Sequence, residues 1–509
     1  MMHGQWNAAT SWRNWRMSLL ATIVVCLTGA GGLNPVWADE PEKIPAASGD
    51  EIPAAPGPET AQAASELAEG KPADGDPSED VPVTATVIDP ATQAAADEYY
   101  QLLRDFADAV DQVERNYVRE ISRKELMEAA INGVLSKLDE YSDFIPEDQV
   151  EGFQKEVKNK FEGIGVQIAV DPQTQRIRVI SPLIGSPAYR AGVLAGDMIV
   201  KVDGEELKEV VLSDVIRRLQ GPPGSKVVVT VTRATEPNPI DIPIERGEVR
   251  VETVLGYARQ PDDSWDFFCD PRRKLGYVRI SAFADHTPEE LQRALEQLKK
   301  QQMAGLVLDL RFNPGGILNS AVETADLFLE SGVIVSAEGR NVAKRIWEAR
   351  REGTFDGFPM AVLVNHYSAS ASEIVAASLQ DHDRAVVIGE RTWGKGSVQN
   401  LVELEGGRGA IKLTTASYLR PSGKNIHRFA NATETDEWGV RPNDGFDVMM
   451  RPGEQVRWLE WRKSRDISHG TPAGTGKDRG QGTREAESDR VADPQLDKAI
   501  SYLTGKLGK

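Results

Sequence analysis

The stretch MAVLVNHYSASASEIVAASLQDHDRAVVIG, residues 360–389, predicts a strand, a helix and a second strand in direct succession. Its first apolar run ends at Asn365 and reads as a buried strand. Ser370, followed three residues later by Glu373 ahead of another apolar run, has the spacing of a capping box that opens a helix. The last apolar run ends at Gly389. Strands that alternate with helices indicate an α/β layer, and functional residues in such a layer tend to lie on the loops at strand ends.

The same alternation extends toward the N-terminus, with strands expected at 275–283 and 304–310 and helices at 288–298 and 319–329. Two loops of this layer carry polar residues. The strand ending at Leu310 runs into RFNPGG, where the paired glycines Gly315 and Gly316 allow the backbone to approach a bound group closely. The other loop is HYSASASE, which places serines at a strand-to-helix transition, where the N–H groups of a helix point outward.

A nucleophilic serine in this second loop would need a base. His366 and His382 flank the serines, so a serine–histidine–aspartate triad must be considered. Lys395 is the better candidate, because it lies between Gly394 and Gly396 just after the next strand, in RTWGKGSVQ. A lysine can act as a general base when burial lowers its pKa enough to make it neutral.

The ends of the chain differ in composition from the middle. Residues 1–38 have two arginines, an apolar run at 17–30 and small residues at 36–38, which predicts a cleaved signal peptide, with an uncleaved membrane anchor as the alternative. Residues 39–95 are acidic and rich in proline and alanine, which predicts a disordered linker. Helical periodicity predicts a packed helix pair within 96–155. At the C-terminus, 453–509 reads as a linker and one short helix, DPQLDKAISYL.

Charge and cysteine content exclude several functions. The 509-residue chain has a formal net charge of −19, and loss of residues 1–38, which carry two arginines and no acid, changes it to −21. So acidic a protein is not expected to bind nucleic acid. Only Cys269 lies beyond the signal segment, so no internal disulfide is expected, and no cysteine or histidine cluster has the spacing of a metal site.

Residues 156–247 are rich in short strands and glycines, and predict a small, partly open barrel with helices. In order they contain GIGV, SPA, AGV, GDMI and VDG, and this set resembles a PDZ domain. The resemblance implies a peptide groove between the strand starting at Val166 and the helix near 211–219. A C-terminal carboxylate would bind the backbone N–H groups of Gly163, Ile164 and Gly165. The alternative is that these glycines only serve tight turns.

The segments DLRFNPGG, SASASEIVAASLQD and GERTWGKGSVQ, after a PDZ domain, resemble the C-terminal processing peptidases, also called tail-specific serine proteases. LDEYSDFIP before that domain and DPQLDKAISYL at the end fit the same family. The resemblance implies a multidomain α/β protein with N-terminal helices, a PDZ domain and, at 248–452, a protease core of the ClpP/crotonase type. It implies no metal or organic cofactor.

The family resemblance also implies roles for individual residues. Ser370 is the expected nucleophile and Lys395 the expected base, with Gln399 positioning the lysine. The expected oxyanion hole combines the N–H of Ala371 with that of Gly316 or Gly315. One departure is WGVRPNDGFDV, where Asn443 is inserted into the family's usual Gly-Ile-x-Pro-Asp pattern; we expect it to affect a strand beside the substrate and not the Ser–Lys pair.

These inferences predict an exported, periplasmic or otherwise extracytoplasmic serine endopeptidase that binds the C-terminal tails of proteins or peptides. A homo-oligomer or an adaptor protein is left open. One alternative is a non-catalytic PDZ scaffold that only tethers peptides. A second is an HtrA-like protease of the trypsin fold, which would need a catalytic Gly-x-Ser-x-Gly motif and a catalytic histidine before the PDZ domain. No such motif is present, and the histidine that precedes this domain, His3, lies in the predicted signal peptide.

Overall fold

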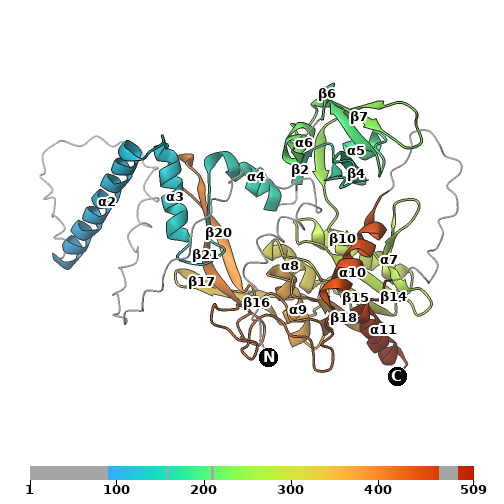
Figure 1. Cartoon of the computed structure of the whole chain (residues 1–509). Coiled ribbons are helices and arrows are strands. Elements are labelled where there is room, and N and C mark those ends of the chain that lie inside the picture. Colours follow the sequence, from blue (N-terminus) through green and yellow to red (C-terminus); the bar gives the residue numbers. More distant parts are fainter. Residues whose placement is uncertain (1–89, 158–159, 208–210, 469–490, 509) are drawn as a thin grey trace, which may run out of the picture. The chain divides into compact units, whose positions relative to one another are not determined.

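The computed structural model describes residues 90–157, 160–207, 211–468 and 491–508 (Figure 1). The chain divides into two compact units, with Ala30–Met127 in one and Glu128–Lys509 in the other. The predicted signal peptide, and the predicted linker up to residue 89, lie outside the described residues. Helix α2 (Pro90–Asn116) begins within the segment that we expected to be linker.

The helices expected within 96–155 form, but the packing expected of them is wrong for α2. The expected pair is α2 and α3 (Arg123–Leu135), and α4 (Glu147–Val157) is a helix that was not expected. Leu102 is 61% exposed, Leu103 44% and Phe106 40%, although their helical spacing predicts a buried face. Periodicity identified the helix correctly but did not identify what covers it.

The α/β layer expected from 275–389 contains a mostly parallel sheet of order β10-β14-β15-β18-β19, with β13 paired to β14. Its strands are β10 (Val254–Leu255), β13 (Phe268–Asp270), β14 (Leu275–Ile280), β15 (Gly305–Asp309), β18 (Met360–Val364) and β19 (Val386–Gly389). The pairs β14/β15, β15/β18 and β18/β19 are parallel. The carboxyl ends of β15 and β18, where the two polar loops begin, therefore lie at one edge of the sheet.

Helices cover both faces of this sheet, which is why its strands are almost continuously apolar. One face packs against α7 (Thr287–Lys300), α8 (Leu318–Asp326) and α9 (Ala371–Asp381). Alternate residues on the other face, including Val307 and Leu363, pack against Leu496, Ala499 and Leu503 of α11 (Pro494–Leu507). The short C-terminal helix predicted from the sequence therefore completes the core.

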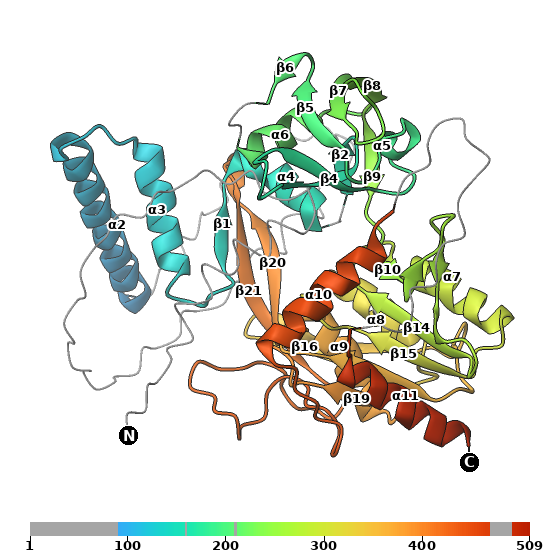
Figure 2. The same ribbon diagram turned by 45° about the vertical axis from the view of Figure 1, so that its right-hand side comes forward.

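A second sheet carries the lysine loop and has the order β1-β21-β16-β17, with β20 paired to β21. Its strands are β1 (Asp143–Ile145), β16 (Val333–Gly339), β17 (Val342–Glu348), β20 (Ser397–Glu403) and β21 (Ala410–Leu419). Figure 2 shows β1 beside β21, and the two are antiparallel with Phe144 opposite Ile411. The short segment that precedes the PDZ region thus belongs to the same sheet as β20 and β21.

The region resembling a PDZ domain forms its own sheet, of order β3-β4-β5-β7-β8, with β6 paired to β5 (Figure 1). The strands are β3 (Val166–Val170), β4 (Ile177–Pro182), β5 (Met198–Val202), β6 (Glu205–Glu206), β7 (Lys226–Thr232) and β8 (Ile240–Glu245). Helix α5 (Pro187–Arg190) and helix α6 (Leu212–Leu219) complete a separate apolar core, and β2 (Lys160–Gly163) pairs with β9 (Gly247–Arg250). β3 is the edge strand, as the peptide-groove interpretation requires.

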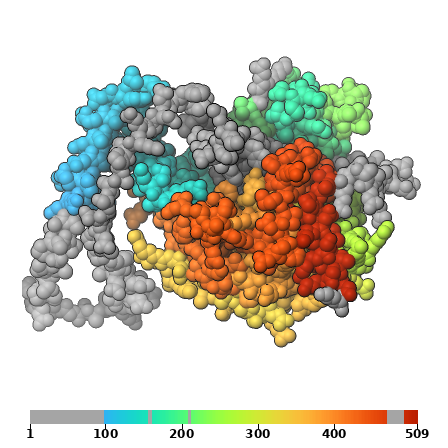
Figure 3. All heavy atoms as spheres, turned by 60° about the horizontal axis from the view of Figure 1, so that its bottom comes forward, coloured from blue at the N-terminus to red at the C-terminus, as the bar shows by residue number. Residues whose placement is uncertain are grey.

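One further helix was not foreseen, α10 (Pro452–Asp466), within a segment that we interpreted as linker. Its Trp458 and Trp461 are buried. The red spheres of the C-terminal segment form part of the outer surface in Figure 3. Among the helices that the structure describes, none has a stretch long and apolar enough to span a bilayer. The described acidic, histidine and cysteine side chains form no cluster able to hold a metal ion.

Candidate active site

Ser370 lies on a sharp turn between β18 and α9, as expected from the sequence. Its backbone has φ 54° and ψ −115°, a positive φ that is unusual for a residue with a side chain. Its side chain is half-buried, whereas the flanking Ala369 and Ala371 are buried. A strained turn of this kind presents a side chain at the end of a sheet, where a substrate can reach it.

The two neighbouring serines have structural partners. The Ser368 hydroxyl donates to the Leu310 carbonyl at 2.8 Å and accepts from the Asn365 N–H at 3.0 Å. The Ser372 hydroxyl donates to the Asn313 carbonyl at 2.9 Å. Both side chains are fully buried. Of the three serines, Ser370 is the one whose side chain reaches the surface.

The Glu373 carboxylate joins the serine loop to the lysine loop. Its Oε2 accepts from the Ser370 N–H at 2.8 Å and from the Lys395 N–H at 2.8 Å. Its Oε1 accepts from the Gly394 N–H at 2.7 Å and the Thr392 hydroxyl at 2.6 Å. A single oxygen atom thus holds the backbones of Ser370 and Lys395 together. The predicted capping box is real, but its acid does more than cap the helix.

Burial and hydrogen bonding act on Glu373 in opposite directions. The side chain is completely buried, and this burial raises the pKa of its carboxyl to about 7, although the four donors favour the ionised form. Around neutral pH the group is therefore close to its titration midpoint.

Lys395 is half-buried, and the two glycines beside it allow close backbone packing. A Cβ on Gly396 would lie 2.3 Å from the His427 nitrogen, and one on Gly394 would lie 2.7 Å from the Arg428 Cβ. The lysine Nζ lies 5.0 Å from the centroid of the Tyr141 ring. The two glycines therefore allow the lysine loop to pack closely against residues 427–428, and they also give its backbone more conformational freedom.

Gln399 lies in β20, and its Nε2 donates to the hydroxyls of Ser397 at 2.9 Å and Thr414 at 3.1 Å. With both amide hydrogens engaged, Oε1 is the atom that remains to accept a hydrogen bond from an amine. This arrangement is compatible with the predicted role of Gln399 in positioning Lys395, and the role itself stays a prediction.

The predicted oxyanion loop lies directly against the serine turn. A Cβ on Gly315 would lie 2.8 Å from the Ser370 Cβ and 3.0 Å from the Ala371 nitrogen, so glycine is required there. The Gly315 N–H donates to the Asn313 Oδ1 at 2.9 Å and is already engaged. Within the described residues, no acceptor is found for the N–H of Gly316 or Ala371. Of the two glycines, the structure favours Gly316 as the donor.

The histidines do not provide a better base. His382 is the C-cap of α9, so it lies about 18 Å along the helix axis from Ser370 at 1.5 Å per residue. Its Nε2 is 2.7 Å from the Val333 carbonyl. His366 Nδ1 is 2.7 Å from the Glu390 Oε2, which connects it to a different carboxylate.

Asn443, the departure noted in the sequence, is part of the contact between residues 440–448 and β19. Its N–H donates to the Val387 carbonyl at 3.0 Å, and its Oδ1 accepts from the Val387 N–H at 2.8 Å. Gln380 of α9 donates to the same Oδ1 at 3.0 Å. The inserted Asn443 is thus accommodated by its hydrogen bonds to β19, at the edge of the parallel sheet.

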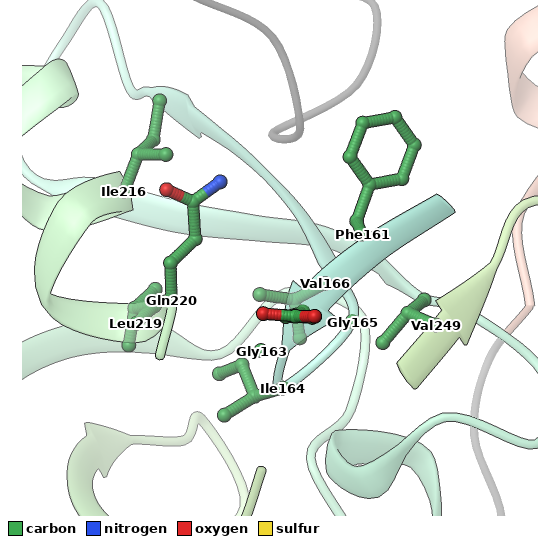
Figure 4. Close-up of a pocket in the computed structure, with 10 residues that line it drawn as sticks. Phe161, Gly163, Ile164, Gly165, Val166, Ile216, Leu219, Gln220 and Val249 are labelled. Carbon is green, nitrogen blue, oxygen red and sulfur yellow. The ribbon is translucent and has the colours of Figure 1, made fainter. Parts of the chain in front are cut away.

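The PDZ region has a small pocket at the predicted position (Figure 4). It lies between α6 and the β2–β3 turn and is lined by Phe161, Glu162, Gly163, Ile164, Gly165, Val166, Ile216, Leu219, Gln220 and Val249. Gly163 forms an isolated bridge with Gln220, so the turn contacts the residue that follows α6. The four predicted peptide-binding residues, Gly163–Val166, all line this pocket, and their binding role stays a prediction.

Comparisons with known proteins agree with this architecture. Residues 274–440 match peptidase family S41, and residues 178–233 match a PDZ domain. The chain is 34% identical over 417 residues to the carboxy-terminal-processing protease of Bartonella bacilliformis, which covers 80% of this chain and 89% of that protein. It is 35% identical over 342 residues to the carboxyl-terminal-processing protease of Synechocystis sp., which covers 67% of this chain and 77% of that protein.

A solved structure, the photosystem II D1 C-terminal processing protease, is 29% identical and covers 72% of this chain and 97% of its own, with a TM-score of 0.39. The chain therefore belongs to peptidase family S41 and is a serine peptidase, a carboxy-terminal processing protease with a PDZ domain. The resemblance found in the sequence is confirmed, and the scaffold and HtrA-like alternatives are set aside.

Sequence reasoning missed several supports of this site. Glu373 was recognised only as a helix cap, and Tyr141 only as part of a motif. Asn313, whose amide group donates to the Ile280 carbonyl at 2.9 Å while its Oδ1 fixes Gly315, was not singled out. An asparagine before a Gly-Gly pair in a strand-end loop was the available signal for this last residue.

Proposed function

We propose that this protease hydrolyses peptide bonds with Ser370 as nucleophile and Lys395 as general base, after its PDZ groove has bound the C-terminal tail of the substrate. The observation that carries the proposal is the shared Glu373 oxygen, which fixes the backbones of both residues. The half-buried Ser370 and the engaged hydroxyls of Ser368 and Ser372 support the choice of nucleophile.

The chemistry follows from this geometry. Neutral Lys395 Nζ takes the proton from Ser370 Oγ as the oxygen attacks the peptide carbonyl. The negative charge on the tetrahedral carbonyl oxygen is stabilised by the N–H groups of Gly316 and Ala371, and one such donor typically lowers the barrier by about 2.7–4 kcal/mol. The lysine returns its proton to the leaving amine. Water then hydrolyses the acyl-serine by the same proton transfers in reverse.

Substrate capture is proposed at the pocket between α6 and the edge strand β3. An extended tail can add to the free edge of β3, with its carboxylate at the Gly163–Gly165 turn and its last side chain in the apolar pocket. The partners are accordingly proteins or peptides with exposed C-termini. We further infer from residues 1–38 that the protease acts outside the cytoplasm.

The test replaces each serine of the cluster in turn. We expect Ser370→Ala to abolish cleavage of an unstructured protein that has an apolar C-terminus, while Ser368→Ala and Ser372→Ala keep measurable activity. Because the latter two hydroxyls are buried and bonded, these variants should lose about 1–3 kcal/mol of unfolding free energy. Melting curves check folding, and an inactive but folded Ser372→Ala beside an active Ser370→Ala would refute the assignment.

A further inference from the structure

Tyr141 lies against the proposed base, yet it comes from a distant part of the sequence, before the PDZ region. The Lys395 Nζ lies 5.0 Å from the centre of its ring, within the range at which an ammonium is attracted to an aromatic face. The tyrosine side chain is half-buried, and this burial raises the pKa of its phenol. The ring is thus neutral at working pH, and the contact is not an ion pair.

The chain around Tyr141 is held in place by several bonds. The Asp139 Oδ1 accepts from the N–H groups of Tyr141 at 2.8 Å and Ser142 at 2.7 Å, which forms a tight turn. The Ser142 hydroxyl accepts from the Thr414 N–H at 3.1 Å. Thr414 also accepts the hydrogen bond from Gln399, so this turn is linked through Thr414 to the strand that follows the lysine loop.

The surroundings of the lysine contain charges of both signs. Glu373 binds its backbone, and Glu140 lies beside Tyr141 in the same turn. From the other side come His427, which makes an edge-to-face contact with Tyr141 at 6.4 Å, and Arg428, against Gly394. Burial lowers the pKa of His427, so this neighbour tends to be neutral.

We propose that Tyr141 is a positioning residue for Lys395, whose ring holds the ammonium of the resting enzyme and so sets where the base lies and how readily it loses its proton. This inference rests on the proposed role of Lys395 as the base. An aromatic face stabilises the charged lysine, whereas a general base must be neutral. The ring therefore opposes activation at low pH and keeps the side chain in place for the moment of deprotonation.

The experiment measures how fast a small fluorophosphonate labels Ser370 as a function of pH, because this probe needs no capture by the PDZ groove. The variants are Tyr141→Phe, Tyr141→Leu and Phe144→Leu. Phe144 is a matched control, since it is a buried aromatic residue of the adjoining strand β1 that packs against Gly409. Melting temperatures are recorded for all variants, and Tyr141→Met replaces Tyr141→Leu if the latter does not fold.

We expect the labelling rate of Tyr141→Phe to rise with pH about the same midpoint as that of the wild type, because this variant keeps the aromatic ring. Tyr141→Leu should lower the midpoint by about half a pH unit, since the stabilised ammonium is lost, and should also lower the plateau rate several-fold. Phe144→Leu should leave the midpoint unchanged. A Tyr141→Leu profile equal to wild type, or a midpoint shifted upward, overturns the inference.

Lys395→Ala separates this inference from the proposed function. If Lys395→Ala is not labelled while Tyr141→Leu matches wild type, Lys395 is the base and Tyr141 does not position it. If Lys395→Ala is labelled at the wild-type rate, the proposed Ser–Lys mechanism fails, and the inference about Tyr141 fails with it.

Discussion

Glu373 shows how one side chain can serve both folding and chemistry. In the sequence it is the acid of a capping box, a feature of many ordinary helices. In the structure its two oxygens accept four hydrogen bonds from the serine and lysine loops. A buried carboxylate is costly to ionise even when it accepts several hydrogen bonds, and this cost is the reason for its raised pKa.

Glu373→Gln tests this account through stability as a function of pH. Because the folded-state pKa is raised from 4.5 to about 7, the folded wild type binds the proton more tightly than the unfolded chain. The contribution of this group to the free energy of unfolding is therefore fully present below pH 4.5 and is lost as pH rises through 7. The loss is about 3 kcal/mol at most.

Glutamine cannot ionise, so we expect the stability difference between wild type and Glu373→Gln to narrow between pH 5 and pH 8. Denaturant unfolding at several pH values measures it. A difference that stays constant over this range would show that the Glu373 carboxyl does not titrate there. Activity should fall in the variant at every pH, because the glutamine NH₂ group cannot accept the hydrogen bonds that backbone N–H groups donate to Glu373.

The residue scale also shows what the sequence could predict. The choice of Ser370 and Lys395 came from a resemblance carried by short motifs, and the structure brings both residues to one carboxylate. The preference for Gly316 over Gly315 could not come from the sequence, because it depends on which N–H the Asn313 side chain engages. Periodicity and motifs do not specify such side-chain bonds.

At the scale of elements, the last helix is fixed to the strand that leads into the oxyanion loop. Arg311 follows β15, and its buried guanidinium donates to Asp309 at 2.6 Å and to Asp493 at 2.9 Å. Asp493 is also the N-cap of α11 and accepts from the Trp458 Nε1 at 2.8 Å. Burial raises the pKa of Asp493, but the Arg311 charge outweighs this effect, so its pKa lies below the ordinary value.

We expect Asp493→Ala to cost about 3–5 kcal/mol of unfolding free energy, because it leaves the buried Arg311 without one of its two carboxylates. Asp497→Ala is the matched control, an exposed acid in the first turn of the same helix, and it should cost only a few tenths of a kcal/mol. Denaturant unfolding compares the two. Equal, small losses would mean that α11 is not fixed through this ion pair.

Elements with strong local signals were predicted well, and elements defined by distant partners were not. The strand–helix alternation of the core and the helix at the C-terminus were confirmed. Helix α10 was missed because its four large apolar residues, Val456, Trp458, Leu459 and Trp461, stand among many charged ones. The burial expected of Leu102 and Phe106 was wrong because a periodic pattern predicts an apolar helix face but does not predict which residues pack against that face.

For the whole molecule, the fold predicted from the sequence was the right one, a PDZ region within a multidomain α/β protease. The motifs GIGV, AGV and GDMI identified the PDZ region because their glycines adopt backbone conformations that residues with side chains rarely adopt. Gly165, for example, has φ 75°, and a Cβ there would lie 2.4 Å from the Ser186 Cβ. The sequence could not show that β1 and β21 pair across more than 260 residues of chain, since a three-residue strand has no pattern of its own.

A substrate with an amidated C-terminus tests the capture step that we propose for the whole molecule. Removing the terminal charge should raise KM, because the backbone N–H groups of the Gly163–Gly165 turn would no longer face a carboxylate. A peptide in which an internal glutamate is replaced by glutamine is the matched control and should be cleaved normally. Steady-state kinetics measures KM for both peptides. Equal KM values for the free and amidated forms would show that the PDZ region does not capture the substrate through its C-terminal carboxylate.

The pairing of β1 with β21 means that the chain first contributes a strand to the second sheet, then builds the PDZ region, and returns at β10 to form the mostly parallel sheet. Along the chain, the PDZ region is thus an insertion within the enzyme and not a module added at one end. Both of its ends are covalently joined to the host, so a rotation of the inserted region would pull on two points of the catalytic framework. One of these points is the strand that follows Tyr141.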